Sequence, residues 1–443
     1  MIISLFYVSF FCVVCLLIFF LFYRDLRKSI VSLFAVLTGF NIFYSRIVVG
    51  TQVYGSIFNY RMLQLHILDI IIVVLLSTIV SYIINEKITI KLNEHYKFLY
   101  IFALLFLGLQ TFLSVFFYKD VISLIGIIRI FVYSLTAGML KYIWDNISLK
   151  TKKAILKSVS YGVCISLLFN LLVGIYQLTF SCAVGLTMFG ESPISRYSTN
   201  IALLRVGEFF VLRAYGFFSH PNVLAAYSLL NLIFFTECYD QYNNLFSYNY
   251  KKIFYLVTIF VIIITFSKSV IICLVFYISY RFFHFKKRKI SKLIPKMFVL
   301  LSLILFVLSI IFSSVSVIST QSVDIRSYQI KEAFNYIVVS FPSSLLGTGY
   351  TRWLFVTAQN PLILENGSLF IQPVHNLFIL LLVELGVATV VFFIYILKRL
   401  KLTLLGEKVS WAFLTLVFLG LFDHYFLTIP VGIMMFISVL IFA

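Results

Sequence analysis

The chain has 443 residues, of which 62% are hydrophobic and 12% charged, and its mean hydropathy is +1.06. Soluble globular domains carry about 25% charged residues, so this composition excludes an ordinary soluble enzyme. The formal net charge of +19 comes from short basic clusters between apolar runs, a pattern typical of membrane proteins and not of nucleic-acid-binding ones.

Apolar runs of membrane-spanning length recur along the whole chain. A transmembrane helix needs about 20 apolar residues, and a backbone inside a bilayer must satisfy its own hydrogen bonds. We therefore expect an all-α polytopic membrane protein with 12 to 14 transmembrane helices. The first run lacks a basic leader and a cleavage site, so we expect a retained helix there. The predicted spans are roughly 2–22, 29–45, 65–84, 98–117, 121–140, 158–180, 221–236, 253–266, 269–283, 297–315, 376–396, 410–425 and 428–443. The two around Ser267-Lys268 are either one long helix or two half-spans.

Lysines and arginines are concentrated in every second loop between the predicted spans. Most of the 35 lysines and arginines fall on one side, which the positive-inside rule assigns to the cytoplasm. The other side carries two long loops, 181–220 and 316–375, with short amphipathic helices. One such helix is expected over 201–218.

No boundary between soluble domains is evident. We predict one transmembrane domain over residues 1–443, made of N-terminal spans 1–157, a catalytic region 158–425 and a last span 426–443.

Several motifs of cofactor-dependent enzymes are absent from the sequence. There is no Walker A motif, no HExxH, no GxSxG and no cluster of His or Cys ligands. The six cysteines lie mostly in apolar runs, where structural thiols are expected. The sequence therefore predicts no metal site and no cofactor.

The run from Arg213 to Asn222, RAYGFFSHPN, places polar residues just before the span 221–236. Proline in the first turn and the free N–H groups of a helix start favour an anion nearby, and arginine matches phosphate oxygens. The alternative is an interfacial arginine that reaches lipid headgroups. The candidate residues here are Arg213, Tyr215, Gly216, His220 and Asn222.

A second polar stretch begins at Arg326, in an amphipathic segment over 326–335. It leads to Gly347, Gly349 and Tyr350, where the glycines permit a tight loop that can approach a ligand closely. The alternative is a surface helix with an arginine on its solvent face.

His375 and Asn376 stand at the external mouth of the span 376–396. A histidine there is a natural proton acceptor for a hydroxyl nucleophile, although it could equally be a helix cap or lie at headgroup level. Lys268, in FSKS, could add positive charge on the same side. Asp423, followed by His424, could orient a histidine, pair with an arginine or only end a helix.

Four motifs in this order resemble the O-antigen polymerase and ligase family of bacterial membrane glycosyltransferases. They are R-x-Y-G-F-x-x-H-P-N from Arg213, T-F-S-K-S at 265–269, R-x6-A from Arg326 followed by G-x-G-Y, and H-N-L-F-x5-E-x-G from His375. The resemblance covers roughly residues 160–425 and implies a multi-spanning, GT-C-like glycosyltransferase fold.

The resemblance also implies a reaction and its residues. Glycan would move from an undecaprenyl-diphosphate donor to an acceptor hydroxyl on the external face of the bacterial inner membrane, without metal or cofactor. Arg213 and Arg326 would bind the donor diphosphate, and His375 would be the general base. Lys268 stands where relatives often have arginine and would be a further cation.

The leading hypothesis is a polymerase of surface polysaccharide repeat units, because the loop 316–375 is long and no ligase-specific feature is evident. The alternatives are a ligase that transfers finished polymer to lipid A–core or protein, and a flippase or exporter. The scarcity of basic residues within spans argues against the last. Expected partners are the undecaprenyl-diphosphate-linked oligosaccharide, membrane lipid and a chain-length regulator protein, with no nucleic acid.

Overall fold

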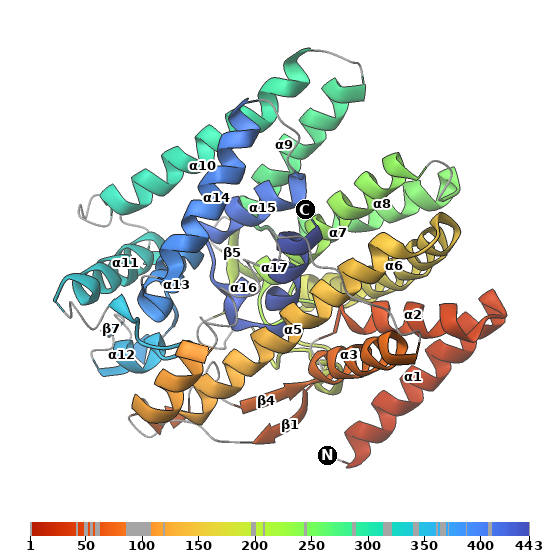
Figure 1. Cartoon of the computed structure of the whole chain (residues 1–443), viewed down its shortest axis with the longest axis horizontal. Coiled ribbons are helices and arrows are strands. Elements are labelled where there is room, and N and C mark those ends of the chain that lie inside the picture. Colours follow the sequence, from red (N-terminus) through yellow and green to blue (C-terminus); the bar gives the residue numbers. More distant parts are fainter. Residues whose placement is uncertain are drawn as a thin grey trace. The chain divides into compact units, whose positions relative to one another are not determined.

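Helices make up most of the described chain in the computed structural model (Figure 1). The structure describes residues 2–40, 43–47, 52–53, 56–57, 63–85, 108–117, 120–195, 201–206, 209–242, 246–285, 289–312, 321–339, 345–359, 362–363, 369–370, 372–386, 388–405 and 410–442.

Two compact units are interleaved along the sequence. The first comprises Met1–Ser45, Gln64–Ile71 and Leu140–Ile278, and the second comprises Arg46–Leu63, Ile72–Met139 and Ser279–Ala443. The boundary predicted between residues 157 and 158 falls inside a continuous helix, α6 (Leu149–Phe180). The division into 1–157, 158–425 and 426–443 stays a prediction.

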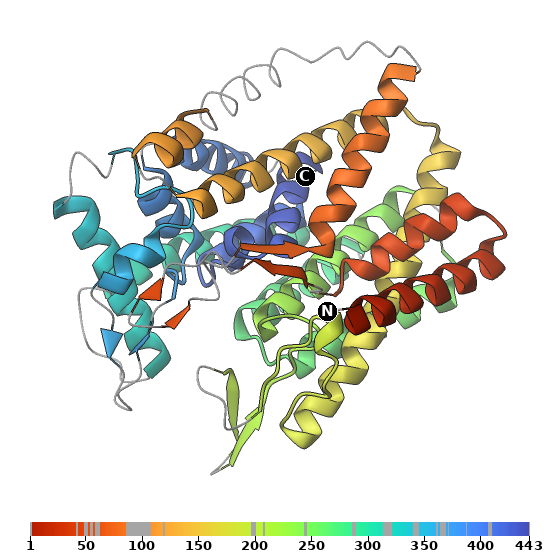
Figure 2. The ribbon, with the colours of Figure 1, turned by 90° about the horizontal axis from the view of Figure 1, so that it is seen from below.

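In the first unit, α6 is the central helix. It packs against α2 and α8, while α1 packs against α2 and α7 against α8. Figure 2 shows α1 and α2 as neighbouring helices at the N-terminal end of the chain. Short polar side chains begin these helices: Asp25 caps α2, Ser148 caps α6 and Ser247 caps α8. The bounds are α1 (Ile2–Tyr23), α2 (Leu26–Leu37), α7 (Pro221–Gln241) and α8 (Tyr248–Ile264), with α9 (Lys268–Phe285) following.

In the second unit, α10 packs against α14 and α15, and α13 packs against α11, α14 and α16. The bounds are α10 (Leu293–Phe312), α11 (Gln321–Val339), α12 (Trp353–Gln359), α13 (Leu377–Leu385), α14 (Ala388–Leu405), α15 (Trp411–Gly420), α16 (Tyr425–Thr428) and α17 (Pro430–Phe442). The π-helix η2 (Leu113–Phe117) and the 3₁₀ helix η4 (Lys289–Lys292) also belong to this unit, whereas the 3₁₀ helix η3 (Thr187–Phe189) belongs to the first. Two further helices, α3 (Ile67–Asn85) and α5 (Val121–Asn146), contain residues of both units.

Small sheets correct the expectation of an all-α chain. The described residues contain four two-stranded sheets: β1 (Phe43–Ile47) with β4 (Leu63–His66), β2 (Gln52–Val53) with β3 (Ser56–Ile57), β5 (Leu203–Val206) with β6 (Phe209–Leu212), and β7 (Leu362–Ile363) with β8 (Leu369–Phe370). The fold is mostly helical rather than purely so.

The predicted amphipathic helix over 201–218 is wrong. Strands β5 and β6 pair with each other there (Figure 2). They are antiparallel, with Val206 opposite Phe209 and Leu203 opposite Leu212. Two apolar, partly β-branched and aromatic runs separated by the pair Gly-Glu are a hairpin signal, and this short-range pattern outweighs the helical one.

Two predicted apolar stretches are each divided into two helices, with a residue of positive φ at the division. The span 376–396 is two helices, because Gly386 has φ +61° and a Cβ there would meet the Leu345 carbonyl oxygen. The stretch around Ser267 is also two helices, α8 and α9, separated at Phe266 with φ +48°.

Two helices in the described part of the chain are long and apolar enough to cross a bilayer, Ser123–Asn146 and Leu149–Phe180. Shorter apolar helices of 10–17 residues occur at Ser9–Tyr23, Leu68–Ser81, Leu293–Leu305, Trp411–Gly420 and Pro430–Val439. Part of the predicted span 98–117, residues 98–107, lies outside the described residues.

Gly162→Ala tests the close packing of α2 on α6. A Cβ at Gly162 would meet the Ser32 carbonyl oxygen and would lie 2.6 Å from the Ala35 Cβ. We expect a loss of about 1–3 kcal/mol of stability, as for other overpacked sites, seen as a lower Tm in detergent. Gly108→Ala is the control, since its Cβ would meet no atom of the described residues within 4 Å. Equal Tm values for the two variants would contradict the packing.

Candidate functional site

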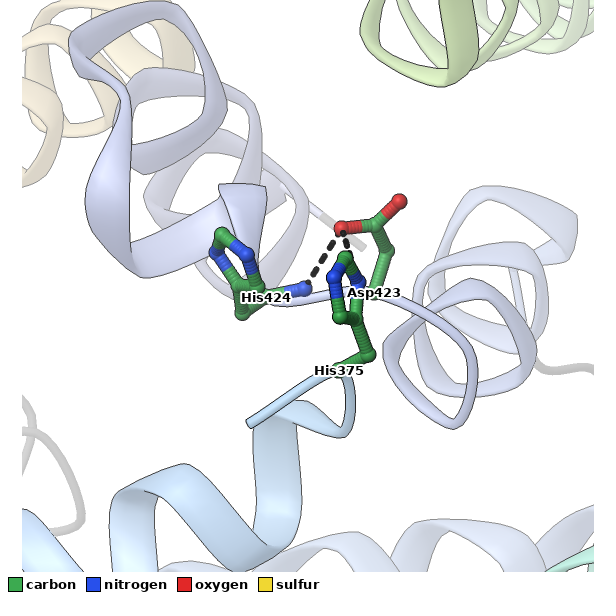
Figure 3. Close-up of side chains that lie close together, drawn as sticks. All are labelled: His375, Asp423 and His424. Carbon is green, nitrogen blue, oxygen red and sulfur yellow. Dashed lines mark hydrogen bonds and ion pairs between the residues drawn. The ribbon is translucent and has the colours of Figure 1, made fainter. Parts of the chain in front are cut away.

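His375, Asp423 and His424 form a cluster in the second unit (Figure 3). His375 immediately precedes the residue that caps α13, whereas Asp423 and His424 lie between α15 and α16. The His375 Nδ1 atom lies 3.7 Å from Asp423 Oδ1, and the same oxygen accepts a hydrogen bond from the His424 backbone N–H at 2.9 Å. The Asp423 side chain is only 9% exposed. The structure thus pairs a largely buried carboxylate with the predicted base.

Both ring nitrogens of His375 face acceptors. The Nε2 atom lies 3.0 Å from Gln372 Oε1, while the buried Nδ1 atom has no partner at hydrogen-bonding distance. At 3.7 Å, the approach to Asp423 is longer than a hydrogen bond, and catalytic contacts often tighten only when substrate binds. His424 is fixed separately, by a 2.9 Å contact between its Nδ1 atom and Thr428 Oγ1.

Helix α11 holds the segment that carries His375. Gln329 Nε2 donates to the Pro373 carbonyl at 3.1 Å, and Gln329 Oε1 accepts from the His375 backbone N–H at 3.4 Å. Arg326 precedes Gln329 by three residues and therefore lies on the same helix face. Its side chain is half-buried, and no hydrogen bond or ion pair joins it to another described residue. The predicted cation and the predicted base are therefore linked through one helix.

Asn376 has a clear structural role. Its Oδ1 accepts from the N–H groups of Phe378 and Ile379 and caps α13, while its Nδ2 donates to the Leu421 carbonyl at 3.2 Å. Leu421 lies two residues before Asp423, so this amide ties the two chain segments of the cluster together.

The loop at Gly347 and Gly349 docks on the end of α13. Thr348 N–H donates to the Val383 carbonyl at 2.8 Å and Gly349 N–H to the Glu384 carbonyl at 3.0 Å. A Cβ at Gly347, whose φ is +75°, would meet the Glu384 carbonyl oxygen. These glycines are needed for this docking, whereas their predicted approach to a ligand stays a prediction.

Tyr350 packs its ring on Gly126, where an added Cβ would come within 2.6 Å. Burial raises the pKa of Tyr350, and the charge of Glu384 raises it further, so the phenol stays neutral at physiological pH. Tyr350 thus packs the loop, and its supporting role at the site stays a prediction.

In the first unit, Arg213 is held by two directed hydrogen bonds. Its Nε donates to the Thr265 carbonyl at 2.7 Å, and its Nη2 donates to Asn222 Oδ1 at 2.9 Å. Thr265 begins the T-F-S-K-S motif, so the first two motifs meet here. Lys268 is exposed at the start of α9, three residues further on.

His220, Tyr215 and Gly216 support this loop. His220 Nδ1 accepts from the Asn222 N–H at 3.2 Å and caps α7, with Pro221 in the first turn. The Tyr215 hydroxyl accepts from the Ala202 N–H at 2.7 Å, and burial raises the pKa of Tyr215. Gly216 has φ +58°, and a Cβ there would meet Asn170 Oδ1.

The cluster also has the donor types of a metal site. His375, Asp423 and His424 each offer one ligand atom, and these atoms lie within 4.8 Å of one another. Two imidazoles and a carboxylate suit zinc or a similar divalent ion. This cluster is not evident from the sequence, because 48 residues separate His375 from Asp423. That the protein works without metal stays a prediction.

Comparison with known families bears on this region. The family model described as O-Antigen ligase matches residues 253–394, about a third of the chain.

Residues 253–394 are an O-antigen ligase family domain.

Members of this family are membrane-bound enzymes that transfer glycans in surface polysaccharide synthesis. The matched O-antigen ligase family domain contains Lys268, Arg326 and His375, whereas Arg213 and Asp423 lie outside it. No curated protein and no solved structure matches the chain.

Asn376→Ala and Asn376→Ser separate the two contacts of this amide. The serine can keep the cap and loses the donation to Leu421, whereas the alanine loses both. We expect the alanine variant to be less stable than the serine variant by about 0.5–2 kcal/mol, the usual value of a cap. Thermal unfolding in detergent measures this, and an alanine variant as stable as wild type would contradict the capping role.

Proposed function

We propose that the chain is a polymerase of surface polysaccharide repeat units. It would transfer a growing glycan from an undecaprenyl-diphosphate donor to a sugar hydroxyl of a second lipid-linked unit. The observation that carries this proposal is the His375–Asp423 pair, held beside α11 and its Arg326 within the unit that contains most of the matched family domain. The pair supplies a base where the family chemistry needs one.

The reaction needs one proton acceptor and a matched leaving group. The acceptor oxygen attacks the anomeric carbon, the bond from that carbon to the diphosphate oxygen breaks, and undecaprenyl diphosphate leaves with the electron pair. Asp423 would accept the His375 Nδ1–H, which leaves Nε2 to take the acceptor's proton. Gln372, now 3.0 Å from Nε2, occupies the position that the acceptor hydroxyl would take.

The diphosphate leaves more easily when cations neutralise it. Arginine is suited to this because its fork of N–H donors matches phosphate oxygens. Arg326 of the second unit would serve this role, and Arg213 and Lys268 of the first unit are proposed as further phosphate-binding cations. Such preorganised donors are worth about 2.7–4 kcal/mol each in other enzymes.

The wider architecture is part of the proposal. We infer 12 to 14 transmembrane helices in a GT-C-like arrangement, in the bacterial inner membrane, with the reaction on the external face. The distribution of lysine and arginine supports this orientation. A chain-length regulator protein would be a partner.

A ligase is the second candidate, because the matching family model is described as O-Antigen ligase. Both reactions use the same donor and base and differ in the acceptor. The length of the loop 316–375 is the feature that favours polymerisation.

Deletion of the gene separates the two candidates. Loss of a polymerase leaves single repeat units on the surface acceptor, and this is the expected result on a polysaccharide gel. Loss of a ligase instead leaves the acceptor bare and accumulates lipid-linked polymer, which would replace our first candidate with the second.

His375→Ala should lower kcat by about 10²–10⁴-fold, the usual contribution of a general base. Asp423→Asn should also lower kcat, because it removes the group that accepts the Nδ1–H and orients the ring. The assay is transfer from lipid-linked repeat unit by purified protein. His284→Ala, an exposed histidine of α9, is the control. Full activity of His375→Ala would remove the base assignment.

Chelation distinguishes a base from a metal centre. We expect turnover to survive prolonged treatment with EDTA, because the proposed chemistry uses only protein groups. A loss that zinc restores, accompanied by one bound ion per chain in wild type and none in His424→Ala, would instead assign the cluster to metal binding.

A further inference from the structure

Two buried amide side chains of α6 form hydrogen bonds with the backbone of the loop that carries Arg213. Asn170 and Gln177 are both 0% exposed and lie seven residues apart, on one face of the helix. Burying an amide without hydrogen-bond partners is costly, so the groups that these two amides bond to show which part of the chain they fix in place.

Gln177 uses all of its hydrogen-bonding capacity here. Its Oε1 accepts from the N–H groups of Tyr215 at 2.8 Å and Gly216 at 2.9 Å. Its Nε2 donates to the Gly216 carbonyl at 3.1 Å and to Glu191 Oε1 at 2.9 Å. One side chain therefore bonds to both the N–H and the carbonyl oxygen of Gly216.

Asn170, two helical turns away on α6, forms a hydrogen bond with the next residue of the same loop. Its Oδ1 accepts from the Phe217 N–H at 2.9 Å, and its Nδ2 donates to the carbonyls of Gly39 and Ser166. Three successive N–H groups, those of Tyr215, Gly216 and Phe217, are thus bonded to side chains of α6. Glycine is required at 216, since φ is +58° and a Cβ would meet the Asn170 oxygen.

Glu191 accepts a hydrogen bond from the Gln177 amide and so fixes the orientation of that side chain. This carboxyl group is 2% exposed and accepts from the N–H groups of Val184, Gly185 and Leu186 as well as from Gln177. The turn over 184–186 and the loop at 215–217 are therefore joined through one carboxyl–amide pair.

Arg213 lies two residues before Tyr215, the first of the three residues whose N–H groups bond to α6. Its direction is set by the Thr265 carbonyl and by Asn222. A loop free to shift would move the Arg213 Cα and lose this direction, whereas a loop bonded to a rigid helix preserves it.

We propose that Gln177 and Asn170, backed by Glu191, are positioning residues that preset Arg213 for the phosphate oxygens of the donor. This inference rests on the proposed role of Arg213 as a diphosphate-binding residue. Preorganised donors avoid reorganisation when charge develops on the leaving group, which is what these hydrogen bonds provide.

A double-mutant cycle on the full-length protein tests it, with lipid-linked repeat unit as substrate. Gln177→Met keeps the side-chain length and removes every hydrogen bond. We expect it to lower kcat/KM at least tenfold in the wild-type background and less than twofold in the Arg213→Ala background, because the arginine it positions is then gone. Equal losses in both backgrounds would show a general structural effect and overturn the inference.

Ser160→Ala is the matched control. Ser160 is a buried polar residue of the same helix, bonded to the Tyr250 hydroxyl at 2.7 Å and not to the loop. Its kcat/KM should remain at the wild-type value. If Gln177→Met does not fold, Gly216→Ala perturbs the same hydrogen bonds from the loop side and should show the same dependence on Arg213.

Failure of the proposed function has a different signature. An Arg213→Ala variant with wild-type kinetics would remove the diphosphate role itself. An impaired Arg213→Ala variant with additive Gln177→Met losses would leave that role in place and remove only the positioning.

Discussion

Most polar groups buried among apolar helices are paired, because an unpaired one is costly, and this tendency shapes both units of the chain. Amides of α6 in the first unit and of α11 in the second bond to backbone, where they hold irregular segments against regular ones. Each bond contributes on the order of 1 kcal/mol net, but leaving its partner unsatisfied costs more. Irregular loops that carry charged residues can therefore be as fixed as the helices beside them.

Each unit contains its own set of candidate site residues, held in place by hydrogen bonds to neighbouring segments. In the first, Arg213 is directed by Thr265 and Asn222. In the second, His375 lies beside Asp423 on a segment that Gln329 holds to α11. The four motifs that are scattered along the sequence thus fall into two local assemblies, two motifs in each.

Long-range pairing limited what the sequence could reveal. Helix positions followed from apolar length, and the choice of His375 and Arg326 followed from motif order. The neighbour of His375 could not be chosen, because Asp423 lies 48 residues away and also fits a helix end. The pairing of β5 with β6 is hard to predict from the sequence because the alternation of the two strands is weak, although the Gly-Glu pair between them is a local hairpin signal. Gln177 and Asn170 gave no signal at all, since a single amide within an apolar helix does not name its partner.

The matched family domain includes His375 and Arg326 but stops before Asp423, so the pairing of His375 with Asp423 comes from the fold alone. Glycan transfer is the activity that we propose for this chain. The most direct measurement supplies purified protein with undecaprenyl-diphosphate-linked repeat unit as its only substrate, and follows the lipid-linked products by mass spectrometry. We expect a ladder of lipid-linked polymers together with free undecaprenyl diphosphate. Unchanged substrate, in a preparation that is folded and binds the substrate, would contradict it.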